Sequence, residues 1–85
     1  MIEKKVGTVF TYFKNVGVAG VKLEAELSVG DTIRIVGATT DFQQKVESMQ
    51  IEKVSVQKAK AGDSVGIKVK ERVRPNDIVY KLSEK

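Results

Sequence analysis

Apolar residues alternate with polar or small residues along most of this 85-residue chain, and this period of two limits the fold more than any other feature. From Ser64 to Lys70, for example, Val65, Ile67 and Val69 alternate with a glycine and lysines. Successive side chains on a strand point to opposite faces, so the pattern predicts strands with one buried face. No segment of ten or more residues carries an apolar stripe at the helical spacing of 3.6 residues.

The alternation and the turn residues between its segments predict six or seven short strands in one domain that covers residues 1–85. The predicted strands are 3–13, 16–23, 32–36, 42–51, 64–70 and 78–82, with a loop at 24–27 and with Val54 and Val56 extending the fourth strand or starting the next connection. Gly7 interrupts the first strand and predicts a bulge or a close backbone approach. The step of three between Val46 and Met49 predicts a second bulge. We expect an all-β fold, a small closed antiparallel β-barrel, because closure leaves no exposed sheet edge.

Aspartates mark three of the predicted turns, after Gly30, after Gly62 and after Pro75-Asn76. Asp31, Asp63 and Asp77 have short side chains that accept hydrogen bonds from nearby backbone N–H groups. We therefore assign these carboxylates to the architecture of the turns and not to chemistry.

Aromatic residues are few, at 6% of the chain. Phe10 and Phe42 are predicted to lie in the core. Tyr12 and Phe13 precede the turn at Lys14-Asn15 and allow two interpretations. An exposed aromatic beside a cation stacks nucleic-acid bases in other small barrels, or anchors a protein partner. The more economical interpretation is that Phe13, with or without Tyr12, plugs one end of the barrel.

The chain contains neither cysteine nor histidine, which excludes most catalytic chemistry. Disulfides, thiolate metal sites and cysteine nucleophiles need the first residue, and imidazole base catalysis and most zinc sites need the second. The neighbouring acids Glu24 and Glu26, like Glu47 and Glu52, lack the clustering that a metal site requires. We predict that the chain is not an enzyme and binds no cofactor and no metal. A Lys/Glu-rich composition poor in thermolabile residues favours a thermophilic source.

The longest apolar runs fall short of the 18 residues of a membrane span, and no apolar signal region follows the N-terminus. We therefore expect a cytoplasmic protein without membrane contact.

Positive charge is concentrated in the second half of the chain, whose net charge overall is +4. A hairpin at Gly62-Asp63 would bring the cations before it beside those after it, and such a face attracts a phosphate backbone. The alternative is a solvated surface that keeps the protein soluble. The candidate nucleic-acid-binding residues are Lys58, Lys60, Lys68, Lys70, Arg72 and Arg74.

Four segments in order carry a resemblance to known proteins: VGTV at 6–9, LSVGDTIRI at 27–35, VESMQI at 46–51 and AKAGDSVGI at 59–67. Together they resemble the second domain of elongation factor Tu and the small elongation-factor-like proteins. The stretches 12–13, 39–42 and 46–51 look especially like the barrel at the C-terminus of the collagenase-like peptidase family, several of whose members act on RNA modification. The resemblance implies a translation-factor barrel. The chain lacks the Gly-x-x-x-x-Gly-Lys-Ser/Thr phosphate loop, so we expect no nucleotide binding.

Two functional hypotheses follow. In the first, the chain is a non-enzymatic binding module in translation or RNA metabolism that contacts tRNA or ribosomal RNA through its basic face. In the second, it is an adaptor that supplies its barrel in trans to a protein partner, either a GTPase or a collagenase-like peptidase or RNA-modification enzyme, with Tyr12 and Phe13 as anchors.

Overall fold

The computed structural model describes residues 2–83, and these form an all-β structure. Among them there is no helix that is long and apolar enough to cross a membrane. The strands are β1 (Ile2–Phe13), β2 (Val18–Leu23), β3 (Leu27–Ser28), β4 (Thr32–Val36), β5 (Asp41–Lys45), β6 (Met49–Ile51), β7 (Val54–Val56), β8 (Lys58–Ala59), β9 (Ser64–Lys68) and β10 (Ile78–Ser83).

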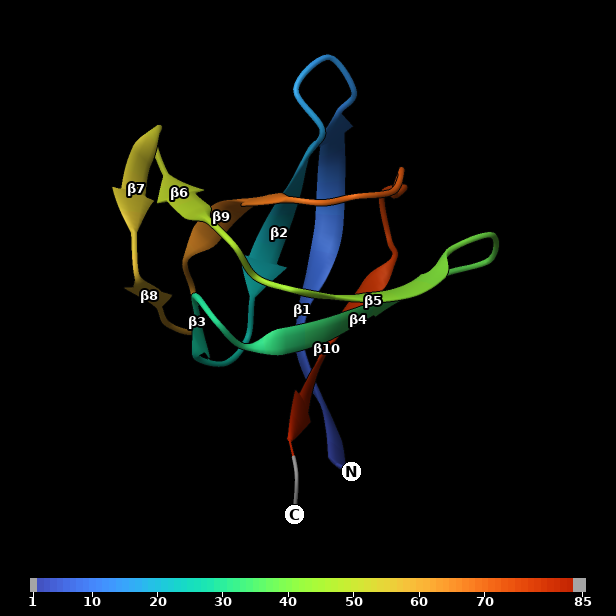
Figure 1. Ribbon diagram of the computed structural model, residues 1–85, viewed down its shortest axis with the longest axis horizontal. Helices are drawn as coiled ribbons and strands as arrows, with labels where there is room; N and C mark the ends of the chain where they lie inside the picture. The colour runs from blue at the N-terminus through green and yellow to red at the C-terminus, as the bar shows by residue number, and fades with distance from the viewer. Residues whose placement is uncertain (1, 84–85) are drawn as a thin grey trace.

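Eight of these strands form one antiparallel sheet in the order β5-β4-β10-β1-β2-β9-β6-β7, and β3 pairs with β8 separately. The sheet curls around the long strand β1, which pairs with β10 on one side and with β2 on the other (Figure 1). The terminal strands β5 and β7 share no hydrogen-bonded ladder. The all-β prediction is confirmed, whereas the closed barrel is not, and ten strands replace the expected six or seven.

The side chain of Gln44 links β5 to the end of β9, two parts of the sheet that share no backbone hydrogen-bond ladder. Gln44 on β5 accepts a hydrogen bond from the backbone N–H of Lys70 at 2.8 Å and donates one to the carbonyl of Lys68 at 2.8 Å. Its amide thus acts as a one-residue extension of β5 toward the end of β9, because it presents one acceptor and one donor in the manner of a backbone peptide.

β1 contains two irregularities. Its register against β10 shifts between Lys5 and Gly7, so the bulge predicted at Gly7 is confirmed. A Cβ at Gly7 would lie 2.6 Å from the carbonyl oxygen of Lys22, which explains why the position is a glycine. A second shift falls between Val9 and Thr11 and leaves Phe10 without a partner on β2. Phe10 is 52% exposed, so its prediction as a core residue is wrong.

The core consists of the inward positions of the alternating strands, and Phe42 lies in it as predicted, at 8% exposed. Burial of such aliphatic side chains is the main stabilising contribution in a small domain. The most deeply buried larger side chains are Val6, Val9, Val21, Leu23, Leu27, Ile33, Ile35, Val46, Met49, Ile67, Val73 and Val79.

The predicted strand 42–51 is two strands, β5 and β6, separated by three irregular residues. Val46 turns its backbone toward the loop before β4, where its N–H donates to the Asp31 carbonyl and its own carbonyl accepts from the Gly30 N–H, both at 2.8 Å. Val46 and Met49 are nevertheless both buried, as the spacing predicted. A break in pairing, rather than a bulge, returns both side chains to the core.

The three turn aspartates perform the same local function. One carboxylate oxygen of Asp31, Asp63 and Asp77 accepts a hydrogen bond from the backbone N–H three residues earlier, at 2.9, 3.0 and 2.9 Å respectively. The prediction of an architectural role is therefore confirmed. The turn at Gly62-Asp63 does not form the expected hairpin, however, because β8 pairs with β3 while β9 pairs with β2 and β6.

Candidate functional site

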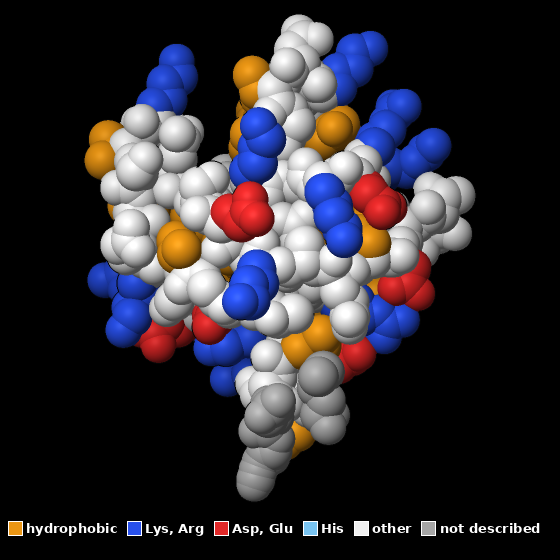
Figure 2. All heavy atoms as spheres, in the orientation of Figure 1, with side chains coloured by type: hydrophobic (Ala, Val, Ile, Leu, Met, Phe, Trp, Pro, Cys, Tyr) orange, Lys and Arg blue, Asp and Glu red, His pale blue; other side chains and the backbone are white. Residues whose placement is uncertain are grey.

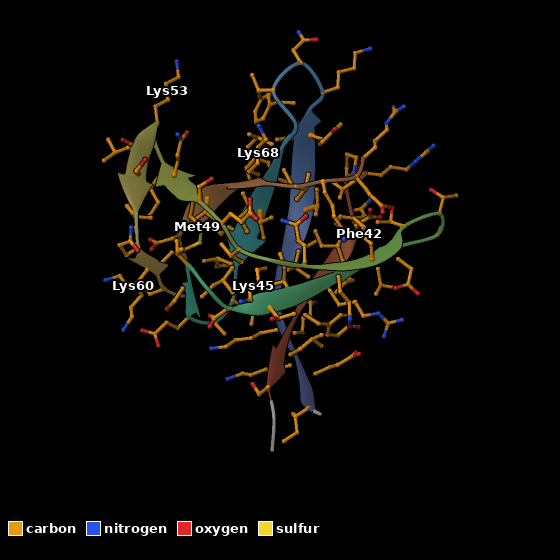
Figure 3. All side chains as sticks on the ribbon, viewed as in Figure 1. Phe42, Lys45, Met49, Lys53, Lys60 and Lys68 are labelled. Atoms are coloured by element: carbon orange, nitrogen blue, oxygen red, sulfur yellow. The ribbon has the colours of Figure 1, made fainter. Side chains whose placement is uncertain are left out.

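The six candidate nucleic-acid-binding cations are all exposed, and the hairpin that would gather four of them is not formed. Because β8 is not beside β9, Lys58 and Lys60 lie away from Lys68 and Lys70. Figure 3 shows Lys60 and Lys68 on different parts of the surface. The juxtaposition of these four lysines depended on a hairpin at Gly62-Asp63, and the turn there does not make one.

The basic residues also differ in their surroundings. The Nζ of Lys58 lies 3.6 Å from a carboxylate oxygen of Glu26, in an ion pair exposed to solvent. Arg72 and Arg74 line a shallow hollow together with Lys14 and Tyr12. The structure thus brings the C-terminal cations beside the aromatic turn of β1, and RNA binding by this group stays a prediction.

Tyr12 and Phe13 have different environments. Tyr12 is half-buried and packs against the core, whereas Phe13 is 54% exposed. The interpretation of Phe13 as a plug is therefore wrong, whereas the packing of Tyr12 against the core agrees with a partly buried role. Phe13 remains available as an anchor for a partner, as the second hypothesis proposed.

An apolar groove of about 400 Å³ lies between two projecting hairpins, β1–β2 and β6–β7. Figure 2 shows it as a notch between two arms at the top of the molecule. Its size falls in the range of about 300–1,000 Å³ that is usual for ligand sites. One wall comes from Phe10, Phe13 and Val16, three of the large apolar side chains that are more than half exposed. The opposite wall comes from Gln50, Glu52 and Lys53, and the floor comes from Val18, Gly20, Ser64, Val65 and Gly66.

The turn at the tip of β6–β7 has a strained backbone. Ile51 pairs with Val54 across a two-residue loop, and the φ angles of Glu52 and Lys53 within it are 51° and 69°. Positive φ at both central residues is typical of a type I′ hairpin turn, which favours asparagine and glycine. Two charged residues thus occupy a costly conformation at the edge of the groove, and such strain is common at functional sites.

The strongest ion pairing on the surface is an Arg34 network away from the groove. Its guanidinium contacts both carboxylate oxygens of Asp41 at 2.9 Å and one carboxylate oxygen of Glu3 at 2.9 Å. The hydrogen bonds from Arg34 hold the pKa of Asp41 below its usual value, and both acids raise the pKa of Arg34. The network ties β4 to β5 and β1, and it offers no reactive group because every charge in it is paired.

Within residues 2–83, no group of three or more acidic side chains is placed to hold a metal ion. Of the residues that line the groove, the sequence analysis named only Phe13 as a candidate, and it missed the central Phe10, Gly20 and Gly66. The glycines carried a usable signal, because each occupies an outward position between two buried residues of its strand. Phe10 carried none, because it follows the equally apolar Val9 and the sequence does not show which of these two neighbours points inward.

The fold and the groove together define a small all-β domain with an apolar recess on its surface. No profile of a known protein family matches the chain. The chain is 43% identical over 81 residues to an uncharacterised protease of Methanocaldococcus jannaschii, across 94% of this chain and 20% of that protein. It is also 43% identical over 82 residues to a collagenase of Porphyromonas gingivalis, across 94% of this chain and 23% of that protein.

Two solved structures share the fold. Both are of the C-terminal domain of a Geobacillus thermoleovorans protein classed as a U32 peptidase, at 24% identity. One superimposes with a TM-score of 0.88 over 94% of this chain and 93% of that domain, and the selenomethionine variant does so with 0.86 over 89% and 96%. The expected similarity to collagenase-like peptidases is confirmed, whereas the resemblance to elongation factor Tu is not. The chain spans about one fifth of the length of the curated relatives it matches.

Proposed function

We propose that this chain is a non-catalytic module that works with the catalytic part of a collagenase-like peptidase. The observation that carries the proposal is the extent of the similarity, which covers 94% of this chain but only 20–23% of the length of the curated relatives. The remaining four fifths of each relative has room for a catalytic domain that this chain does not contain. The lack of histidine and cysteine in the chain agrees with a binding function rather than a chemical one.

The arrangement of the chain ends supports such a module. Ile2 pairs with Ser83, so the start of β1 and the end of β10 lie side by side at one pole of the molecule. The β1–β2 turn lies at the opposite pole (Figure 1), and Phe13 and Val16, beside and within this turn, belong to one wall of the groove. A catalytic domain joined at the first pole, or bound there in trans, leaves the groove open to a further partner. The relatives give no support to a role in translation.

A domain exchange in the Porphyromonas gingivalis collagenase tests the proposal. The first variant lacks the segment of 82 residues that matches this chain, and the second carries this chain in its place. We expect the deletion to lower turnover of gelatin by about tenfold, because a tethered binding module raises the local concentration of substrate. Turnover of a short peptide substrate should not change, and the exchange should restore gelatin turnover.

Two outcomes would contradict the proposal. If the deletion variant degrades gelatin as fast as the intact protein, the module has no part in the activity. If it loses both turnovers while circular dichroism shows it folded, the segment belongs to the catalytic machinery. Adding this chain as a separate protein to the deletion variant distinguishes action in trans, which predicts co-sedimentation and recovery, from action that requires a covalent link.

A further inference from the structure

The floor of the groove is built from paired outward positions of β2 and β9. Along this face the register places Val18 opposite Lys68, Gly20 opposite Gly66 and Lys22 opposite Ser64. The residues between them, Ala19, Val21, Val65 and Ile67, point into the core. The outer face therefore has a glycine pair at its centre and one lysine near each end.

The centre of this floor is flat because it lacks side chains. The ring of Phe10 covers Gly20, since a Cβ there would lie 3.0 Å from its Cζ atom. At Gly66 a Cβ would meet only Val18, at 3.1 Å, so the surface beside the Phe10 ring is open. A large apolar side chain placed on Gly66 would contact the wall of Phe10, Phe13 and Val16 and lose its exposure to water, as would the wall.

The groove is lined by one anion and one cation and is flanked by two further lysines. Lys22 and Lys68 flank the lining, because each pairs with a lining residue at one end of the β2–β9 face: Lys22 with Ser64, and Lys68 with Val18. The two pairs are four residues apart along the strands, a distance of about 13 Å at about 3.3 Å per residue. Lys53 lies on the rim with Glu52, the one acid of the lining. None of these three lysines is in an ion pair with any residue between 2 and 83. The groove therefore complements a ligand that is apolar at its centre and anionic at both ends.

We propose that the groove binds an extended polypeptide segment in which one large apolar residue lies between two acidic residues, at positions i, i+2 and i+4. An extended peptide presents every second side chain on one face, with the same rise per residue as β2 and β9. Its first and third such side chains then reach Lys22 and Lys68 while the second rests on Gly66. This inference rests on the proposed function only for the source of the polypeptide, which would be a substrate of the catalytic part.

A polypeptide fits this groove better than a single-stranded nucleic acid. Backbone groups of Gly20 and Gly66 are used in the β2–β9 ladder, so the floor has few donors and acceptors with which to contact bases. Glu52 also interrupts the positive rim, and a phosphate backbone requires a continuous basic track. Binding of a labelled oligouridylate tests the nucleic-acid alternative separately.

The test is a fluorescence anisotropy titration of the full chain against the labelled peptide SGDSLSDGS. Three peptides of equal length serve as controls: SGKSLSKGS reverses the charge, SGDSSSDGS removes the apolar residue, and SGDDLSSGS moves one acid out of register. We expect each control to bind about tenfold more weakly or worse, and Phe13→Ser or Lys68→Glu to weaken the first peptide by a similar factor. Lys60→Glu, an exposed lysine away from the groove, should leave its affinity unchanged.

Amide chemical shifts of the labelled protein locate the bound peptide and verify that each variant is folded. Perturbations at Gly20 and Gly66 support the proposal. It is overturned if SGDDLSSGS binds as tightly as SGDSLSDGS, if Phe13→Ser and Lys68→Glu bind unchanged, or if a labelled oligouridylate binds the groove more tightly than the peptide. The outcome of the domain exchange does not depend on the peptide titration, so a failure of the peptide proposal is distinguishable from a failure of the proposed function.

Discussion

At Asp77 one buried carboxylate holds a turn and also determines a neighbouring residue. Asp77 is 4% exposed, and one of its oxygens accepts the N–H of Arg74 at 2.9 Å. Its other oxygen fills the space beside Gly37, where any Cβ would overlap it. The requirement for glycine at position 37 thus comes from crowding, and not from a left-handed backbone.

Gly37→Ala is therefore expected to destabilise the protein strongly. Because the overlapping group is a buried and hydrogen-bonded carboxylate, it cannot move aside without losing the turn, and we expect a loss of about 1–3 kcal/mol or more. Urea denaturation measures it. Gly66→Ala is the matched control, since its nearest contact is a Val18 methyl at 3.1 Å; equal losses in the two variants would refute the argument.

Asp41 makes stability depend on pH through its pairing with Arg34. The folded-state pKa of Asp41 lies below its usual value of 3.8, so the folded protein favours the ionised form. The stabilisation is complete above the unfolded-state pKa and is lost as the pH falls through the folded-state pKa. Asp41→Asn should lower the melting temperature near neutral pH, with the difference from the parent shrinking below about pH 3.8.

The exposed Glu47, which has no ion pair within residues 2–83, provides the control for Asp41. Glu47→Gln should give a small difference from the parent. A deficit of Asp41→Asn that persists unchanged into strong acid would mean that the carboxylate stabilises the fold by something other than its charge.

At the scale of the strand, the side chain of Gln44 replaces a ladder that the sheet lacks. We expect Gln44→Ala to lower stability by about 0.5–1.5 kcal/mol, the usual net contribution of a hydrogen bond. Amide exchange at Lys70 should accelerate, because its N–H loses its acceptor. Gln43→Ala, at the exposed neighbouring position on β5, should change neither quantity. Unchanged exchange at Lys70 would show that another group protects it.

The β6–β7 turn offers a prediction of opposite sign. Replacing Glu52 by Asn and Lys53 by Gly supplies the residues that a type I′ turn favours, so the double variant should gain about 0.5–2 kcal/mol. Thermal unfolding measures the gain. The single variant Lys53→Gly should bind SGDSLSDGS more weakly than the parent, because it removes this cation from the rim while Glu52 stays. A loss of stability in the double variant would show that the φ values at this turn carry no strain.

At the scale of the whole molecule, strands distant in sequence hold the sheet together. β10, the last strand, lies between β4 and β1 and pairs with both. Removal of residues 78–85 should therefore leave a chain without cooperative unfolding or dispersed amide resonances, since both halves of the sheet lose their common partner. A truncated chain that retains dispersed resonances would show that β1, β2 and β9 fold independently.

Several parts of this structure were predictable because their causes are local. The turns at Asp31, Asp63 and Asp77 follow from side chains that reach backbone groups three residues away. The inward faces of β4 and β9 follow from strict alternation, and the bulge at Gly7 follows from an interruption of that alternation. The exposure of Lys68 and Lys70 was also predictable, because both alternate along the chain with the buried Val69 and its apolar neighbours and therefore point away from the core.

Alternation alone determined that this chain forms strands with one apolar face, since side-chain direction along a strand depends only on its immediate neighbours. The partner of each strand was decided by the tertiary structure, because pairing joins segments such as β3 and β8 that are distant in sequence. The groove was likewise decided by the tertiary structure. Gly20 meets Gly66 only because β9 pairs with β2 and not with β8, and the ring of Phe10 covers Gly20 only because β1 pairs with β2.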